Sequence, residues 1–501
     1  MKILEIDYKE LLSDDDCLAI LPYEFVEKYN CLIYCKYKNG YVVLVANNFE
    51  YYNISKLNFF IKTEIYLCYL NQNDWLQIIK NLKLNEDRNN AVNNFKINSE
   101  ISSNEYLNEA QNSFYNIEIN NAPIVKIVDS IIEEAINFRS SDIHFEPFEQ
   151  FIKVKYRVDG SLIEKTTLPI ESLSEISTRI KVLSKLDITK KFIPQDGKLI
   201  FNSLDKSYDI RVSFLPCIFG EKIALRILDN HNNVMHLNDL NFTDNALTSI
   251  NQIINLNSGL VLVVGPTGSG KSTTLHAFLE KNVERNENII TVEDPVEYRI
   301  NGITQVQVNE EAGLDFATCL RTILRQDPNI IMIGEIRDLE TAKIACRASI
   351  TGHLVYSTLH TNTSVGVINR LKDMNIEPYL LVDSLKAIIS QRLVRCLCPK
   401  CKSEEIISID DAKYFNIPVD TPVYKAIGCG YCNMTGYNGR RGVYEIILLD
   451  EDFRKLIIED STNKKIYNLI KKKKIELMID NAKSFVIDGI TSIEELKTII
   501  N

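Results

Sequence analysis

The sequence predicts an α/β protein whose centre is a mostly parallel sheet covered by helices. Residues 260–264 form a short apolar, β-branched run, as expected of a strand buried on both faces. A glycine-rich turn follows, and a helical pattern begins near residue 271. As far as residue 359, strand-like and helix-like segments then alternate. Alternation of this kind joins parallel strands through helices, so the sheet should be mostly parallel.

The composition is that of an ordinary globular protein with more than one domain. The chain has 501 residues, 45% of them hydrophobic and 25% charged, which suffices for several cores. The net charge of −10 does not favour nucleic acid as a partner. No apolar run is long enough to span a bilayer, and the first residues do not resemble a signal peptide, so we expect a cytoplasmic protein.

Residues 1–85 are expected to form a small N-terminal α/β domain. The segments 32–37 and 41–46 are rich in β-forming residues and flank the turn Lys38-Asn39-Gly40, which is a hairpin signal. Residues 86–118 are rich in Asn, Ser and Glu, a composition typical of a linker. The N-terminal part carries no pattern that indicates catalytic chemistry.

Residues 119–235 are expected to form a compact middle domain. Pro123 suits the first position of a helix, and apolar residues recur at helical spacing up to Ile136. Apolar and basic residues alternate at 151–159, which predicts a half-exposed strand. The other elements expected are a helix at 173–186, a turn at 194–197, and strands at 208–214 and 222–228.

Residues 236–395 are expected to form the central α/β domain, and residues 446–501 a group of C-terminal helices. In a parallel sheet of this kind the ligand binds at the carboxyl ends of the strands. The basic run 471–474 is either a solvated helix end or a contact with an anionic membrane surface. After the first strand, the central domain should contain strands at 288–293, 330–333 and 353–359, and helices at 316–325 and 339–349.

The turn after the first central strand matches a phosphate-binding loop. Residues 265–272 fit the pattern GxxxxGK[ST] at every fixed position. Glycine lets phosphate oxygens approach backbone N–H groups, and the following helix directs its positive end at the anion. Lys271 should reach the β- and γ-phosphates of a bound triphosphate, and Ser272 should bind Mg²⁺ through its hydroxyl. The residues expected to bind the nucleotide are Gly265, Pro266, Thr267, Gly268, Ser269, Gly270, Lys271, Ser272 and Thr273.

Two of the predicted strands end in glutamates suited to serve this nucleotide. Glu335 follows the strand at 330–333, where a carboxylate in phosphate-loop enzymes holds Mg²⁺, directly or through water. Glu293 ends the strand at 288–293 and is our candidate for the group that orients or deprotonates the attacking water. The alternative for each glutamate is an ordinary strand end without a catalytic role.

Two histidines and two arginines are further candidates. His353 and His360 flank the strand at 353–359 and would sense the γ-phosphate or bridge to Glu335, although a lone histidine is usually structural. No neighbouring residues complete a set of metal ligands around them. Arg211 and Arg226 lie on predicted strands of the middle domain. They are simply solvated unless this domain folds over the nucleotide, where they would neutralise transition-state charge.

Four of the twelve cysteines form a pattern typical of a metal site. Cys398, Cys401, Cys429 and Cys432 make two CxxC pairs, whose thiolates would bind Zn²⁺ tetrahedrally and leave no open position. We therefore expect a structural zinc subdomain at 396–445. A redox-active dithiol is the alternative, and Cys396 is close enough in sequence to substitute as a ligand. The other cysteines are expected to be reduced.

Taken together, these motifs resemble the type II/type IV secretion ATPase superfamily over about residues 120–450. Within it, the run 361–366 and the start Leu21-Pro22-Tyr23 are similar to the type II secretion branch. Besides the phosphate loop, the resemblance rests on runs that occur in family order, at 141–147, 157–160, 194–197, 209–213, 220–226, 291–297, 324–328, 335–338, 351–362 and 398–440.

The resemblance implies a RecA-like ATPase domain preceded by a PAS-like middle domain, in a homo-hexameric motor. ATP would bind with Mg²⁺ between these domains, with Arg211 and Arg226 at arginine-finger positions. Hydrolysis would power pseudopilus assembly at the inner membrane, with which the protein would associate peripherally. Its expected partners are a bitopic inner-membrane protein that docks the N-terminal domain, a polytopic platform protein, and acidic phospholipid.

Two residues depart from the family pattern. His276 stands where an aromatic residue is common, and Asn329 stands where Asp is usual. We expect neither of them to touch the chemistry.

Two other functions stay open at this point. One is a type IV pilus assembly ATPase, and the other is a nucleotide-dependent scaffold that hydrolyses little ATP. The intact set of Lys271, Ser272, Glu293 and Glu335 argues against the scaffold. A motor that moves nucleic acid is disfavoured by the acidic balance of the chain.

Overall fold

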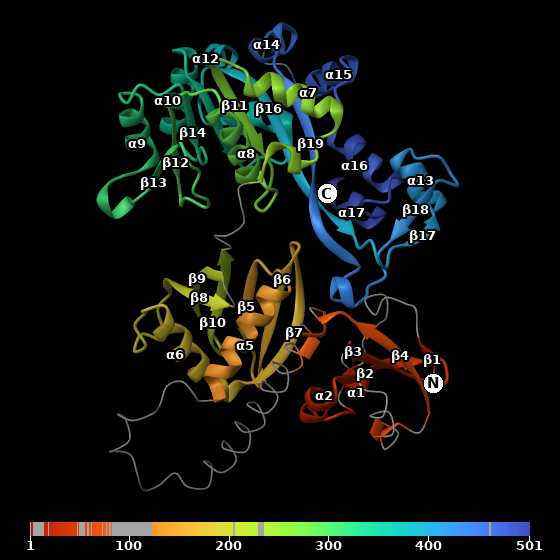
Figure 1. The fold of residues 1–501 in the computed structure, drawn as a ribbon. Coiled ribbons are helices and arrows are strands. Elements are labelled where there is room, and N and C mark those ends of the chain that lie inside the picture. Colours follow the sequence, from red (N-terminus) through yellow and green to blue (C-terminus); the bar gives the residue numbers. More distant parts are fainter. Residues whose placement is uncertain are drawn as a thin grey trace. The chain divides into compact units, whose positions relative to one another are not determined.

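The computed structural model describes residues 2–3, 15–18, 20–47, several short stretches between 49 and 82, and residues 123–203, 206–228, 235–459 and 462–500 (Figure 1). The chain divides into two compact units. One holds the residues up to 231 together with 398–401 and 427–436, and the other holds 232–397, 402–426 and 437–501. The linker expected at 86–118 lies outside the described residues. The finer division into six parts stays a prediction.

The N-terminal domain contains a four-stranded sheet in the order β1-β4-β3-β2. β2 and β3 form the predicted hairpin, in which Ile33 lies opposite Val43, whereas β4 pairs with β3 in parallel. β2 and β3 are buried along most of their length, so their apolar runs form the core of this domain. The elements are β1 (Lys2–Ile3), α1 (Asp15–Leu18), α2 (Tyr23–Tyr29), β2 (Cys31–Tyr37), β3 (Gly40–Ala46) and β4 (Glu64–Leu70).

The middle domain is a six-stranded antiparallel sheet in the order β7-β6-β5-β10-β9-β8 (Figure 1). β6 alternates between buried and half-buried residues, as predicted. The apolar face of α5 packs with the buried side chains of the sheet and of α6 in one core. The elements are α5 (Pro123–Asn137), β5 (Asp142–Pro147), β6 (Phe151–Val158), β7 (Ser161–Pro169), η3 (Ile170–Ser172), α6 (Leu173–Leu183), β8 (Gln195–Ser203), β9 (Lys206–Cys217) and β10 (Gly220–Leu228).

The turn predicted at 194–197 is wrong, because β8 already begins at Gln195. Gln195 and Gly197 pair with Phe214 and Val212 of β9. Proline and glycine usually indicate a turn, but here each has a local reason to border or enter a strand. Pro194 precedes the first residue of the ladder, where its missing N–H costs no strand bond. A Cβ on Gly197 would lie 3.0 Å from the side chain of Leu186, so the close packing favours glycine.

The central domain is a seven-stranded sheet in the order β13-β12-β14-β15-β11-β16-β19. All neighbouring strands are parallel except β16 and β19, which confirms the predicted α/β class. Apolar cores cover both faces of the sheet. The elements of this domain as far as residue 359 are η4 (Leu237–Leu240), α7 (Asp244–Ile254), β11 (Gly259–Val264), α8 (Lys271–Val283), β12 (Ile289–Glu293), β13 (Thr304–Gln307), η5 (Glu310–Ala312), α9 (Phe316–Ile323), β14 (Ile330–Ile333), α10 (Leu339–Ile350) and β15 (Leu354–Leu359).

The C-terminal part is largely helical after residue 451, as predicted. In the basic run, Lys473 pairs with Asp450 at 2.6 Å and with Asp452 at 2.7 Å, whereas its lysine neighbours are exposed. No described helix is long and apolar enough to cross a membrane. The elements are α11 (Ser364–Asp373), α12 (Pro378–Ser384), β16 (Leu385–Leu397), β17 (Ser403–Ile406), α13 (Ile409–Phe415), β18 (Pro422–Lys425), η6 (Gly430–Cys432), β19 (Tyr437–Leu448), α14 (Glu451–Ile458), α15 (Asn463–Lys472), α16 (Met478–Ile487) and α17 (Ile493–Ile500).

A buried ion pair joins α6 to the sheet of the middle domain. The Nζ atom of Lys181 lies 2.7 Å from Oε1 of Glu221, and both side chains are at most 8% exposed. The same ammonium donates to the carbonyl oxygen of Lys190 at 2.8 Å. A charge buried this deeply is tolerated only while its partner is present.

Replacing Lys181 by Met should lower the free energy of unfolding of the middle domain by about 3–5 kcal/mol, because Glu221 is left as an unpaired buried charge. The matched control is Lys153→Met, which breaks the more exposed pair with Glu164 and should cost at most about 1 kcal/mol. Urea unfolding followed by circular dichroism measures both variants. Equal costs for the two would contradict the structural role of the buried pair.

Candidate functional site

The phosphate loop forms a tight turn between β11 and α8. Gly268 and Gly270 have φ angles of 78° and 84°, which side chains rarely allow. A Cβ on Gly265 would lie 2.2 Å from the backbone oxygen of Gln391, and a Cβ on Gly270 would lie 2.8 Å from the side-chain Nε2 of Gln391. Gln391 on β16, which the sequence analysis did not identify, therefore lies directly against the loop. Close packing and backbone conformation together require these glycines.

Lys271 begins α8, and its side chain folds back over the loop. Its Nζ donates to the carbonyl oxygens of Gly265 at 2.9 Å and Pro266 at 3.1 Å. Burial lowers the pKa of Lys271, and attraction to the Glu335 carboxylate partly opposes this. An ammonium at the N-terminus of a helix, beside free backbone N–H groups, forms an anion site. The next residue, Ser272, is exposed at the same end of the helix.

Glu335 lies two residues beyond β14 and is held by the side chains of Arg337 and His360. Its Oε2 is 2.9 Å from Nε2 of His360, and its Oε1 accepts from Nε of Arg337 at 2.8 Å. Burial alone would raise the pKa of Glu335, but the bonds from Arg337 and His360 outweigh it and hold the pKa below its ordinary value. The carboxylate is 18% exposed. It is therefore an ionised group at the carboxyl edge of the sheet, within electrostatic reach of Lys271.

The structure separates the two candidate histidines to opposite edges of the sheet. His353 precedes β15, and its backbone oxygen accepts from Gly259 at the start of β11. Its ring Nδ1 lies 2.9 Å from the carbonyl oxygen of Ala348 in α10. Because β11 and β15 run parallel from this point, the phosphate loop and His360 lie at their far ends. His353 therefore lies away from this chain's phosphate loop and from Glu335, and its role in sensing the γ-phosphate stays a prediction.

Glu293, the last residue of β12, lies in a buried hydrogen-bond network. Only 4% of the residue is exposed. Its Oε1 accepts from Thr291 Oγ1 at 2.7 Å and from Gln305 Nε2 at 3.1 Å, and its Oε2 is 3.1 Å from Nε2 of His276. Burial alone would raise the pKa of Glu293, but these contacts, led by His276, hold the pKa below its ordinary value. The network keeps a buried carboxylate ionised.

His276, which we expected not to touch the chemistry, contacts the candidate carboxylate Glu293, whereas Asn329 lies elsewhere. His276 is the sixth residue of α8, and its ring contacts the carboxylate that ends β12. The sequence signal was available, because a histidine takes the place of an aromatic residue one turn after Lys271. Asn329 instead bonds to Asn288 where β12 and β14 begin. Thr291, Gln305 and Arg337 were missed because ordinary hydrogen-bonding residues carry no distinctive spacing.

The two candidate arginines are neighbours in the middle-domain sheet. Arg211 of β9 and Arg226 of β10 lie opposite each other. Nε of Arg226 lies 2.9 Å from Oδ1 of Asp142, and Nε of Arg157 lies 3.6 Å from Oδ2 of the same carboxylate. The three arginines and one acid leave this part of the sheet surface basic. The domain and the phosphate loop belong to different compact units, so their role at the nucleotide stays a prediction.

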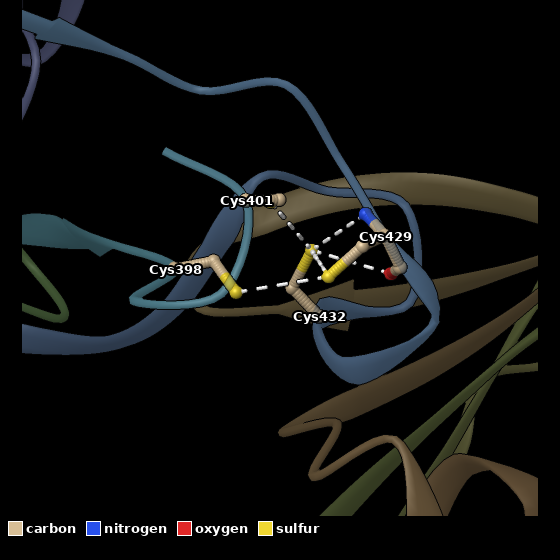
Figure 2. Close-up of side chains that lie close together, drawn as sticks. All are labelled: Cys398, Cys401, Cys429 and Cys432. Atoms are coloured by element: carbon tan, nitrogen blue, oxygen red, sulfur yellow. Dashed lines mark hydrogen bonds between the residues drawn. The ribbon is translucent and has the colours of Figure 1, made fainter. Parts of the chain in front are cut away.

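The four cysteines of the two CxxC pairs come together at one point (Figure 2). Their sulfur atoms all lie within 4.8 Å of one another. Neighbouring sulfurs are 3.8–3.9 Å apart, for Cys398 with Cys429, Cys401 with Cys432, and Cys429 with Cys432. The backbone N–H groups of Cys429 and Gly436 donate to the sulfur of Cys432 at 3.2 Å. Cys396 is not part of this group.

This geometry fits a tetrahedral zinc ion. With zinc–sulfur bonds of about 2.3 Å, the sulfurs of a tetrahedral site are about 3.8 Å apart, close to the distances of the three neighbouring pairs here. A disulfide would need about 2.05 Å between two sulfurs, which none of these pairs approaches. Four sulfur donors leave no open position, so the donor set is that of a structural metal site.

Replacing Thr291 by Val should destabilise the chain by about 1.5–3 kcal/mol at pH 7, because the ionised Glu293 loses a hydrogen-bond donor. A carboxyl whose folded pKa is lowered contributes stability above its ordinary pKa, and this is lost as the pH falls through the folded value. The cost should therefore shrink as the pH falls below 4.5. Urea unfolding at several pH values measures it.

The control for this experiment is Thr248→Val on α7, an exposed threonine whose hydroxyl donates to the backbone oxygen of Asp244. It should cost less and show no such pH dependence. A cost for Thr291→Val that stays constant from pH 7 into the acid range would contradict the ionised network around Glu293.

The chain was compared with known proteins. The family model described as "Type II/IV secretion system protein" matches residues 118–498. A type II secretion system protein E from Aeromonas hydrophila is 42% identical over 416 residues, which are 83% of this chain and 81% of that protein. The type II secretion system ATPase E of Vibrio cholerae is 42% identical over 404 residues, covering 80% and 78% of the two chains.

Solved structures agree on the fold. The Legionella pneumophila ATPase DotB has a TM-score of 0.56 and 23% identity to this chain, covering 77% of this chain and 98% of that one. DotB from Yersinia pseudotuberculosis has a TM-score of 0.56 at 21% identity, with 79% and 99% coverage. At this level of identity the likeness shows the α/β fold alone.

Proposed function

This chain belongs to the type II/IV secretion system protein family, and we propose how its residues bind and hydrolyse ATP. The chain is an ATPase of type II secretion, because relatives with that function match it over most of both lengths. The matches do not assign the residues of the mechanism, the assembly or the partners, and we propose these below.

One observation carries the proposal for the site. Glu335 lies within electrostatic reach of Lys271 and is held by His360 and Arg337 at the carboxyl edge of the sheet. The loop from Gly265 to Thr273 would bind the phosphates through its N–H groups, and Lys271 would exchange its carbonyl contacts for β- and γ-phosphate oxygens. His360, bonded to Glu335, would report the presence of the γ-phosphate.

Ser272 and Glu335 are the residues that would hold Mg²⁺. The hydroxyl and the carboxylate are oxygen donors of the kind this ion prefers. Ser272 lies in the first turn of α8, and Glu335 lies just beyond β14 at the carboxyl edge of the sheet. A bound Mg²⁺ supplies neutralisation of the charge that develops on the phosphates. Glu293 is proposed as the carboxylate that orients or deprotonates the attacking water.

The assembly and partners are proposed from the family resemblance. A homo-hexamer would bring the basic surface around Arg211 and Arg226 to the nucleotide, where Arg226 would leave Asp142 for the phosphates. The N-terminal domain would dock a bitopic inner-membrane protein, and a polytopic platform protein and acidic phospholipid would contact the motor. The motor would then lie in the cytoplasm and associate peripherally with the inner membrane. The relatives are named for type II secretion, so no observation favours pilus assembly or a scaffold.

Replacing Lys271 by Ala should lower kcat/KM for ATP at least about 100-fold, because a desolvated cation at the developing charge is lost. Lys281→Ala is the matched control on the same helix, since its exposed ammonium pairs with Glu284 within the described chain. A coupled assay of phosphate release in the presence of Mg²⁺ measures both. Turnover by Lys271→Ala equal to that of Lys281→Ala would overturn the proposed site.

We propose that Cys398, Cys401, Cys429 and Cys432 bind one structural zinc ion. The support is the tetrahedral spacing of their sulfurs and the N–H groups that point at Cys432. Binding four thiolates would fix the two loops that carry them. Among the described residues, these cysteines form a small buried cluster of their own.

The purified protein should contain about one zinc ion per chain, as measured by inductively coupled plasma mass spectrometry. Cys432→Ser should lose most of the zinc and melt at a lower temperature. Cys396→Ser should keep its zinc and its melting temperature, because Cys396 lies outside the group of four cysteines. Retention of zinc by Cys432→Ser, or its loss from Cys396→Ser, would contradict the assignment.

A further inference from the structure

The hydrogen bonds around Glu293 leave its carboxylate one free direction. An ionised carboxylate offers four lone-pair sites. Within the described chain, Oε1 accepts from Thr291 and Gln305, which fill its two sites, whereas Oε2 has a single partner, His276. The fourth site, on Oε2, is therefore the one at which a water can be accepted. The direction of this free lone pair is set by Nε2 of His276, which contacts the other lone pair of Oε2.

His276 is built to be a donor with a fixed direction. The residue is 1% exposed, and its ring lies edge-on to Tyr298 with the centroids 5.7 Å apart. Its Nδ1 is buried, and no described residue offers it a hydrogen bond. A proton on Nδ1 would therefore be buried without an acceptor, so the neutral ring should carry its proton on Nε2 and donate to Glu293.

The same residue connects Glu293 to the phosphate loop. His276 follows Lys271 by little more than one turn of α8, and Glu293 ends a strand separated from β11 by β14 and β15. The other partners of the carboxylate, Thr291 and Gln305, come from β12 and its outer neighbour β13. His276 is thus the partner that joins the position of Glu293 to the helix that begins at the nucleotide.

We propose that His276 is a positioning residue for ATP hydrolysis, which holds Oε2 of Glu293 in the orientation that accepts the attacking water and couples it to α8. This inference rests on the proposed function, in which Glu293 serves the water. It uses a histidine found where an aromatic residue is usual in the family, and it assigns that residue a role through Glu293 alone, with no contact to the nucleotide.

The test compares three variants of the full chain that differ in where a donor is placed. His276→Gln puts an amide N–H near the position of Nε2, His276→Asn puts one near Nδ1 instead, and His276→Phe removes the donor while keeping a ring. Steady-state ATP hydrolysis with Mg²⁺ gives kcat, KM and the pH profile of kcat. Melting temperatures show whether each variant is folded.

For His276→Phe and His276→Asn we expect kcat to fall about 10- to 100-fold, as for the loss of one hydrogen bond to a charged group. KM for ATP should change less than about threefold, since no contact with the nucleotide is lost. Losing a donor that favours ionised Glu293 raises its pKa, so the acid limb of the kcat profile should move to higher pH. His276→Gln should restore both kcat and the profile.

The outcomes separate this inference from the function on which it rests. If the natural chain hydrolyses ATP and folded His276→Phe matches it in kcat and pH profile, the inference alone is overturned. Equal losses in the Gln and Asn variants would also overturn it, because the position of the donor would then not matter. A natural chain that hydrolyses no ATP overturns the proposed function, and this inference with it.

Discussion

Parallel pairing of β11, β12, β14 and β15 is the constraint on which the candidate site depends. Parallel strands end at one edge, so the loop before Lys271, Glu293, Glu335 and His360 are gathered there although they lie far apart in sequence. The residues that precede these strands, including His353, lie at the opposite edge. The apolar runs that bury both faces of the sheet thus also decide which polar residues can act together.

The two carboxylates at this edge are kept ionised in different ways. Glu335 is partly exposed and held by the side chains of Arg337 and His360, which suits a group that exchanges partners when phosphate and metal arrive. Glu293 is buried and held by a hydroxyl, an amide and an imidazole, which suits a group with a fixed direction. Glu335 and Glu293 thus differ in exposure and in partners, which allows them to serve separate tasks.

The sequence predicted those parts of the fold and site in which a pattern follows from covalent geometry. The phosphate loop needs its glycines at fixed spacing, the CxxC pairs bring four sulfurs together, and the alternation of strand and helix segments predicts the parallel sheet. It failed where tertiary packing decides. Glycine at 197 reflects contact with Leu186 instead of a turn, and the contact of His276 with Glu293 depends on how α8 crosses the sheet. The separation of His353 and His360 follows instead from their positions at the two ends of one strand.

The most direct test of this account is a double-mutant cycle on kcat for Glu335→Gln and His360→Ala. The account holds that these residues act as one bonded pair beside Lys271. Each single change should then lower kcat to about the same level, and the double variant should be little slower than the slower single one, as for groups that work as a unit. Losses that multiply in the double variant would show that the two residues act independently, and would contradict the site described for this ATPase.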